Sequence, residues 1–433
     1  MKKQFFLFLF FIPGMFYSQT IHKCYSKEAI DYQNSLIPNY EQHVNEQFEI
    51  AKQWSNNHTP TRSLYTIPVV FHIVYNNSEQ NISDDIIQNQ IDILNQDYAR
   101  LNPDTVNTRL EFQNLVGSTN VRFVLAQVDP DGNPTSGITR TQTNMSTFGT
   151  WDLDFNELEK VKSTVDGGKD PWDQEHYLNI WVCDMSVDFL GTPYVMLLGY
   201  ATPPLGLPNW PPDSGTEDLG DGVVLQYHAV GDFLHNTNDI LPESKGRTAV
   251  HEVGHYLGLR HIWGDGDCTM DDGIEDTPDA TDASMQDCNF NINSCNADVM
   301  GLGDLNDMVE NFMDYSSELC QNSFTQNQIA LMHGVLENQR QELALINFGV
   351  GIDEIENLDF NVFPNPTYTN LNFSSVKEMK NISIYNLNGT LLFEKEGNFL
   401  STSLNVNDLS SGIYVVNVNF MNGQSFHKKI SKK

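Results

Sequence analysis

The stretch "AVHEVGHYLGLRH" at residues 249–261 holds three of the chain's 12 histidines and one glutamate. His251 and His255 are four residues apart, so a helix would place them one turn apart on the same face. Two imidazoles in this arrangement can bind one zinc ion at about 2.0–2.1 Å each. Glu252 lies beside them and could take a proton from a water molecule activated by the metal.

His261 cannot belong to the same helix, because ten further residues of helix would carry it about 15 Å along the axis. Gly258 can adopt the left-handed conformation that ends helices, so the chain can turn back there. Three protein ligands would leave a fourth zinc position open, which is typical of a catalytic rather than a structural site. The spacing therefore predicts a catalytic zinc site formed by His251, His255 and His261.

The composition and the first residues limit the remaining possibilities. A chain of 433 residues predicts two or three units. The balance of 57 acidic to 24 basic residues argues against nucleic acid and anionic membranes as partners. The first 18 residues combine Lys2 and Lys3 with a short apolar run, which predicts a secretory signal peptide. No later segment is apolar for long enough to predict a membrane span.

Three segments of different character follow the signal peptide. Residues 19–61 are polar, with helical patterns at 26–36 and 39–54, and are interpreted as a propeptide. Residues 62–345 alternate strands and helices, which predicts a mixed α/β (α+β) domain. The expected strands are 64–76, 120–129, 177–185 and 221–231, and the expected helix is 83–102. Residues 352–433 show short alternating strands with Asn-Gly turns, the pattern of a small all-β sandwich.

The segment "HEVGHYLGLRH" resembles the extended zinc motif of the metzincin metallopeptidases. Together with "DDGIEDTPD" and "NFMDYS", it looks like the pappalysin family, over roughly residues 62–345. The resemblance implies a twisted mixed sheet with an active-site helix, zinc on the three histidines and Glu252 as the general base. It further implies Met313 as the methionine of the turn beneath the metal. Tyr315 would help to stabilise the transition state.

Four of the six cysteines cluster after the zinc motif, at positions 268, 288, 295 and 320. In an exported protein this cluster predicts two disulfides, with three possible pairings. A second zinc site is the alternative, but no C-x-x-C pair is present. The pappalysin resemblance implies the pairs Cys268–Cys295 and Cys288–Cys320. Cys183 lies in an apolar strand pattern and is expected to be a buried free thiol.

Cys24 stands alone in the predicted propeptide. Its thiolate could occupy the open zinc position and keep the enzyme latent, as in related proenzymes with a cysteine switch. The alternative is an incidental unpaired thiol. Removal of the segment near Arg62 would then activate the enzyme, and the Thr61–Arg62 bond is a candidate for self-cleavage because relatives often cleave before arginine.

The segment 263–282 has eight carboxylates and no basic residue. Oxygen ligands at this density are suited to Ca²⁺, although the EF-hand spacing is missing. Relatives similar to this chain bind calcium nearby, which implies Asp271, Asp272, Asp276 and Thr277 as ligands. A solvated acidic loop is the alternative.

Substrate recognition gives two weaker expectations. Residues 221–231 could form the edge strand that pairs with an extended peptide. Relatives that prefer arginine after the scissile bond carry an acidic residue past the methionine turn, and Glu318 is the candidate here.

The C-terminal segment has its own resemblance. "FNVFPNPTYTNLNF", "ISIYNLNGTLL" and "LSSGIYVVNV" look like the sorting domain of the type IX secretion system of Bacteroidetes, over roughly 355–433. The resemblance implies recognition by that machinery, export across the outer membrane and removal of the tail. A carbohydrate- or protein-binding module is the alternative.

Two classes of function are thus weighed. The first is a secreted zinc endopeptidase made as a latent proenzyme, acting on proteins or peptides. The second is a surface adhesin or binding protein with a structural zinc site. Glu252 favours the first, because a structural site would use a fourth protein ligand instead. A thermolysin-like peptidase would need a glutamate ligand from a later N-E-x-x-x-[SD] segment, which does not follow. The sequence leaves the physiological substrate and the oligomeric state open.

Overall fold

The computed structural model describes residues 21–58, 64–189, 192–204, 220–285, 287–295, 302–344, 361–386, 391–420 and 425–433. The predicted signal peptide and the predicted cleavage site at Arg62 lie outside these residues, as do the Asn-Gly turns of the C-terminal segment. The chain divides into two compact units, Met1–Ile346 and Asn347–Lys433. None of the helices in the described ranges has the length and apolar content needed to cross a membrane.

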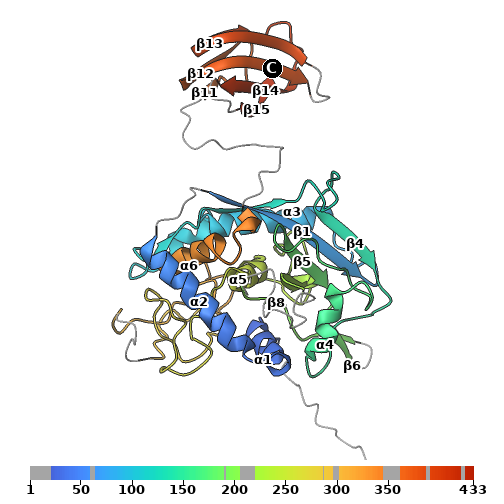
Figure 1. Cartoon of the computed structure of the whole chain (residues 1–433), viewed down its shortest axis with the longest axis vertical. Helices are drawn as coiled ribbons and strands as arrows, with labels where there is room; N and C mark the ends of the chain where they lie inside the picture. Colours follow the sequence, from blue (N-terminus) through green and yellow to red (C-terminus); the bar gives the residue numbers. More distant parts are fainter. Residues whose placement is uncertain are drawn as a thin grey trace, which may run out of the picture. The chain divides into compact units, whose positions relative to one another are not determined.

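A six-stranded sheet organises the first unit, in the order β3-β1-β5-β9-β8 with β4 also paired to β1 (Figure 1). The strands are β1 (Tyr65–Tyr75), β3 (Val121–Leu125), β4 (Ile138–Gln142), β5 (Leu178–Cys183), β8 (Gly199–Ala201) and β9 (Val223–Gln226). All pairings are parallel except that of β8 with β9. The central strands β1 and β5 are buried almost throughout, as their continuous apolar sequences predict. The mixed α/β fold class is therefore confirmed.

The interior strand β9 corrects one expectation. Residues 221–231 were expected to give an edge strand, but β9 lies between β5 and β8. All four of its residues are buried, so its apolar run reflects a strand covered on both faces. The edge next to the zinc motif is formed by the short strand β8.

The helix that carries the first part of the zinc motif packs against a second helix. Helix α3 (Asp84–Tyr98) buries Ile87, Ile91 and Leu94 at helical spacing. It contacts α5 (Arg247–Tyr256), where the Tyr98 hydroxyl donates to the Val250 carbonyl at 3.2 Å. Helix α5 is buried along its whole length, which fixes the direction of its side chains.

The N-terminal helices pack on the rest of the first unit (Figure 1). Helix α1 (Ser26–Leu36) contacts β8, and α2 (Tyr40–Asn57) packs on α6 (Gln326–Glu337). At that contact a Cβ atom on Gly334 would clash with the carbonyl oxygen of Ala51. The two backbones can therefore approach closely only because residue 334 is glycine.

Short elements complete this unit. They are β2 (Val116–Gly117) paired with β10 (Phe324–Thr325), β6 (Ser186–Phe189) paired with β7 (Thr192–Val195), and α4 (Phe155–Leu158). Most of the described residues between 257 and 323 form loops rather than helices or strands.

The second unit is an antiparallel five-stranded sheet in the order β11-β12-β14-β15, with β13 also paired to β12. Its strands are β11 (Asn361–Phe363), β12 (Asn370–Asn386), β13 (Leu391–Asn405), β14 (Gly412–Phe420) and β15 (Ser425–Lys432). The alternating apolar residues of these strands form a core of their own, which includes Phe373, Ile384, Val416 and Val418. This all-β architecture was predicted from the sequence.

Candidate metal centre and substrate cleft

Helix α5 and the turn that follows it bring the three histidines together. The helix ends at Tyr256, and Gly258 adopts a left-handed conformation with φ of 94°. The chain then returns, so that the Nε2 atom of His255 lies 3.1 Å from the Nε2 atoms of both His251 and His261. Ligands of a tetrahedral zinc ion at 2.0–2.1 Å lie about 3.3 Å apart, so this spacing suits zinc.

The other ring nitrogen of each histidine faces an acceptor. The Nδ1 atoms of His251 and His255 lie 2.7 and 2.8 Å from the carbonyl oxygens of Phe312 and Leu259. The Nδ1 atom of His261 lies 2.6 Å from the Asp265 carboxylate. Each Nδ1 must therefore carry the proton, and the three Nε2 lone pairs converge on one point. Burial lowers the pKa of His251 and His255, the latter to about 3, which keeps both neutral. This donor set fits a zinc ion.

Cys24 reaches the same point from the N-terminal segment. Its sulfur lies within 4.8 Å of the ligand nitrogens of all three histidines, and all four residues are buried. The backbone on both sides of it pairs with residues 196–199, which lead into β8. The His22 amide donates to the Met196 carbonyl at 2.8 Å, and the Tyr25 amide donates to the Gly199 carbonyl at 3.1 Å. The N-terminal segment thus occupies the cleft edge as an extended peptide would.

Glu252 lies beside the three histidines and is completely buried. Its Oε2 atom accepts a hydrogen bond from the Ser26 hydroxyl at 3.0 Å and contacts the Cys24 sulfur at 3.4 Å. Its Oε1 atom is buried and has no hydrogen-bond partner in the described part of the chain. Burial raises the pKa of this carboxyl to about 8. Gly199 of β8 makes room for it, since a Cβ there would come within 2.9 Å of Glu252 Cγ.

Met313 and Tyr315 surround the histidines as the resemblance implies. Met313 is fully buried beneath α5, and a Cβ atom on Gly254 would clash with its sulfur. The Tyr315 ring lies 5.6 Å from the His251 ring and 4.9 Å from the His261 ring, measured between centroids. Its hydroxyl donates to the Cys24 carbonyl oxygen at 3.2 Å. This donor therefore points at a peptide carbonyl in the cleft.

Lys23 lines a pocket of about 240 Å³ beside the metal centre. The Lys23 ammonium donates to the carbonyl oxygens of Asp314 and Ser316 at 3.2 and 2.9 Å. Glu318 also lines this pocket. Its carboxylate accepts from the backbone amides of Lys245 and Thr248, at 2.6 and 2.9 Å, and so caps the start of α5. Sequence reasoning did not single out Lys23, although it directly precedes Cys24.

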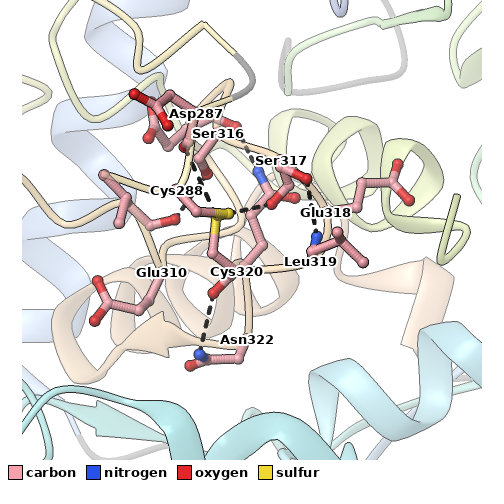
Figure 2. The surroundings of a disulfide bond; sticks show 12 residues. Asp287, Cys288, Glu310, Ser316, Ser317, Glu318, Leu319, Cys320 and Asn322 are labelled. Atoms are coloured by element: carbon pink, nitrogen blue, oxygen red, sulfur yellow. Dashed lines mark hydrogen bonds between the residues drawn. A yellow bond between two sulfur atoms is a disulfide. The ribbon is translucent and has the colours of Figure 1, made fainter. Parts of the chain in front are cut away.

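The loop-rich segment after α5 is held by two disulfides, Cys268–Cys295 and Cys288–Cys320. These are the pairs that the resemblance implies, and Cys183 is a buried free thiol as expected. Figure 2 shows that the second disulfide attaches the segment bearing Ser316, Ser317 and Glu318 to the neighbouring loop at Asp287. It therefore anchors one wall of the Lys23 pocket.

The hydrogen bonds of the predicted calcium ligands do not place all four side chains around one site. Asp272 is buried, and its oxygens accept from the Thr277 hydroxyl at 2.9 Å and from the Ile274 amide at 2.8 Å. Asp276 instead accepts from the Asn327 amide at the start of α6, at 2.9 Å. A group of three or more side chains whose ligand atoms lie within 4.8 Å of one another could hold a metal ion. Among the described residues, the acidic loop with Asp271 contains no such group. Calcium stays a prediction.

These features together define a metzincin metallopeptidase. A buried helix beside the sheet carries two histidines and a glutamate, the chain returns with a third histidine, and a methionine lies beneath them. Comparison with known proteins gives the family. The family model described as pregnancy-associated plasma protein-A matches residues 162–337, and one described as a secretion system C-terminal sorting domain matches residues 361–433. The chain belongs to the pappalysin family.

Solved structures and curated relatives agree. Mature mirolysin of Tannerella forsythia, in complex with a cleaved peptide, is 39% identical over 66% of this chain and 97% of its own, with a TM-score of 0.55. A promirolysin variant from the same organism is 36% identical over 74% of this chain and 96% of its own, with a TM-score of 0.60. An extracellular metalloprotease of Arthroderma gypseum is 28% identical over 62% of this chain and 71% of its own. The chain is therefore a secreted metalloendopeptidase made as a proenzyme.

Proposed function

We propose that His251, His255 and His261 bind the catalytic zinc ion and that Glu252 is the general base of peptide-bond hydrolysis. When bound, zinc polarises the scissile carbonyl and lowers the pKa of water in the site. The observation that carries the proposal is the buried Glu252 carboxylate beside three converging Nε2 lone pairs. Its partnerless Oε1 atom is available to a water molecule once the N-terminal segment has left.

Different residues then carry out the proton transfers and the stabilisation of charge. Glu252 takes a proton from the attacking water and passes it to the leaving nitrogen. The Tyr315 hydroxyl, which donates to a peptide carbonyl in the latent form, donates to the oxyanion in the reaction. Met313 supports the site from below and takes no part in the chemistry.

Latency is proposed to come from Cys24 as the fourth ligand. Its buried position near all three histidines supports this role, because it fills the place that water needs. The segment before Arg62 would be removed on activation. The C-terminal domain would direct export through the type IX secretion machinery and then be cleaved off. Calcium in the segment 263–282 would stabilise the loops around the cleft.

Substrates are proposed to carry a basic side chain next to the scissile bond. The support is the buried Lys23 side chain directly before Cys24, whose ammonium group donates to the backbone carbonyls of Asp314 and Ser316. Matched peptides with lysine, arginine or leucine at each position flanking the bond test this, and equal cleavage of the leucine peptide would contradict it.

The test of the catalytic proposal starts from the full chain, and an added protease removes the segment before Arg62 from the parent and the variant alike, because a variant without the base cannot process itself. Peptide cleavage is measured with and without a zinc chelator, and compared with Glu252→Gln, which keeps the shape of the side chain but not the base. Loss of cleavage in both cases, with zinc content unchanged in Glu252→Gln, is expected. A protein that holds zinc and folds but never cleaves peptides would favour a structural zinc site in a binding protein.

A further inference from the structure

We propose that Asp265 is a positioning residue of the metal centre, which orients His261 and strengthens its binding to zinc. The inference rests on the proposed zinc function. It adds a residue that lies outside the zinc motif and takes no direct part in the chemistry.

The contact of Asp265 differs from those of the other two histidines. His251 and His255 donate their Nδ1 protons to neutral backbone carbonyls, whereas His261 donates to the Asp265 carboxylate at 2.6 Å. A carboxylate acceptor makes the opposite nitrogen a stronger electron donor to the metal and fixes the ring in one tautomer. His261 is therefore the histidine whose metal affinity depends on a side chain.

The backbone between the two residues is built for this contact. The Gly264 amide donates to the His261 carbonyl at 2.9 Å, which closes a turn. Gly264 and Asp265 both adopt left-handed conformations, with φ of 61° and 56°. A residue other than glycine costs about 1–2 kcal/mol in this conformation, so the fold maintains the turn against its local preference. The turn brings the carboxylate back to the imidazole four residues earlier.

The neighbouring rings leave the orientation of His261 to this hydrogen bond. Trp263 stacks on the His261 ring with 4.3 Å between centroids and an angle of 6°, while Tyr315 contacts it edge-on at 4.9 Å. Stacking holds the plane of the ring but does not distinguish its two nitrogens. The Asp265 carboxylate does, because it can accept only from the nitrogen that carries a proton.

A measurement of zinc affinity tests this role without relying on activity. The full chain carries Glu252→Gln throughout to prevent self-cleavage, and its zinc dissociation constant is determined by competition with chelators. Asp265→Ala should weaken zinc binding by about 10- to 100-fold. Asp265→Asn should weaken it less, because its amide oxygen still accepts the Nδ1 proton.

Asp267→Ala is the matched control, because this exposed carboxylate lies in the same loop and accepts only from Thr269. It should leave the zinc affinity unchanged. Parent affinity in Asp265→Ala, or an equal loss in Asp267→Ala, would overturn the role of Asp265. If Asp265→Ala does not fold, the isosteric Asp265→Asn decides: weaker binding than in Asp267→Asn supports the role, and equal binding overturns it. His251→Ala separates the two proposals, since retained zinc binding there would contradict the zinc site itself.

Discussion

Ser26 is the residue through which the N-terminal segment holds the proposed general base. Its hydroxyl donates to Glu252 at 3.0 Å and accepts from the Ala201 amide of β8 at 2.8 Å. Its own amide contacts the Cys24 sulfur at 3.3 Å. One small side chain therefore connects the base, the rim of the cleft and the cysteine proposed to block the metal.

Replacement of Ser26 by alanine is predicted to give the unprocessed proenzyme measurable peptidase activity. The variant removes the hydrogen bond to Glu252 and leaves the Ala201 amide without its acceptor. A hydrogen bond contributes about 0.5–1.5 kcal/mol, so the open fraction should rise by about 2- to 10-fold. The measurement is the initial rate of peptide cleavage by unprocessed proenzyme.

Ser35→Ala is the control, because the exposed Ser35 hydroxyl bonds only to the Tyr32 carbonyl of the same helix. Its initial rate should match that of the parent chain. If the Ser26→Ala proenzyme cleaved peptide no faster than the Ser35→Ala proenzyme, the hydrogen bonds of Ser26 would not be needed for latency.

The residues of the site differ in how far the sequence could reveal them. The geometry of a zinc site requires the spacing of the three histidines and Glu252, so the sequence motif was enough to identify them. Ser26 and Lys23 make contacts that only the tertiary fold creates, and Asp265 meets His261 through a turn that the sequence pattern did not predict. Glu318 was expected near the floor of the substrate pocket, and it lines the pocket beside Lys23. Its oxygens also accept from the backbone amides of Lys245 and Thr248 at the start of α5. Spacing along the chain cannot reveal this second role.

At the scale of elements, helix α2 attaches the N-terminal segment to the rest of the first unit through contacts of its own. Its Phe48 ring lies 3.8 Å from the Arg260 guanidinium, and Lys52 pairs with Glu275 at 2.9 Å. Its closest backbone contact is that of Ala51 with Gly334 of α6. We therefore expect latency to depend on a helix–helix contact as well as on the contacts around Cys24.

Gly334→Ala is predicted to have opposite effects on the proenzyme and the mature enzyme. In the proenzyme the new methyl group clashes with the Ala51 backbone, so α2 should loosen, self-processing should accelerate and the unfolding temperature should fall. In the mature enzyme, from which the segment with α2 is proposed to have been removed, alanine should stabilise α6 by about 0.5–1 kcal/mol over glycine. Thermal unfolding of both forms measures the difference.

Gly412→Ala serves as the control, because a Cβ there makes only ordinary contacts with Tyr414, at 3.8 Å or more. It should change neither the processing rate nor the unfolding of the peptidase unit. Equal effects of Gly334→Ala on both forms would argue against α2 as an anchor.

The Cys288–Cys320 disulfide is predicted to stabilise the wall of the Lys23 pocket. Its removal in the paired Cys288→Ser, Cys320→Ser variant releases a loop with a sequence separation of 32. Loop-closure entropy for this length amounts to about 3–4 kcal/mol of unfolding free energy. The measurement is denaturant unfolding, in parallel with KM for a basic peptide, which should rise. Removal of Cys268–Cys295 should cost similar stability but affect KM less, and an unchanged KM in the first variant would contradict the link to the pocket.

At the scale of the whole molecule, the two units have separate cores. One cluster runs from Phe48 to Leu343 and the other from Val362 to Ile430. The sequence revealed this division because the change from mixed to purely alternating apolar patterns changes the fold class. It could not reveal that residues 221–231 lie inside the sheet, because a short apolar run is compatible with an edge or an interior strand.

Separate cores predict that a chain ending after Ala344 is a complete peptidase but is not exported. Units with their own cores fold independently, so the shortened chain should unfold at the same temperature as the first unit of the full chain. After activation it should cleave peptides with the same kcat/KM. In a bacterium with a type IX secretion system it should accumulate inside the cell, because it lacks the sorting domain at 361–433.

A chain ending after Leu336 is the matched control for this truncation. It removes Arg340, whose buried guanidinium pairs with Asp221 and donates to the Tyr256 carbonyl at the end of α5 at 2.9 Å. Removing one partner of a buried ion pair costs about 3–5 kcal/mol, so this shorter chain should unfold or lose activity. If the chain ending after Ala344 failed in the same way, the peptidase would need its C-terminal domain to fold. If that chain were exported normally, sorting would have to reside in the peptidase unit or the signal peptide.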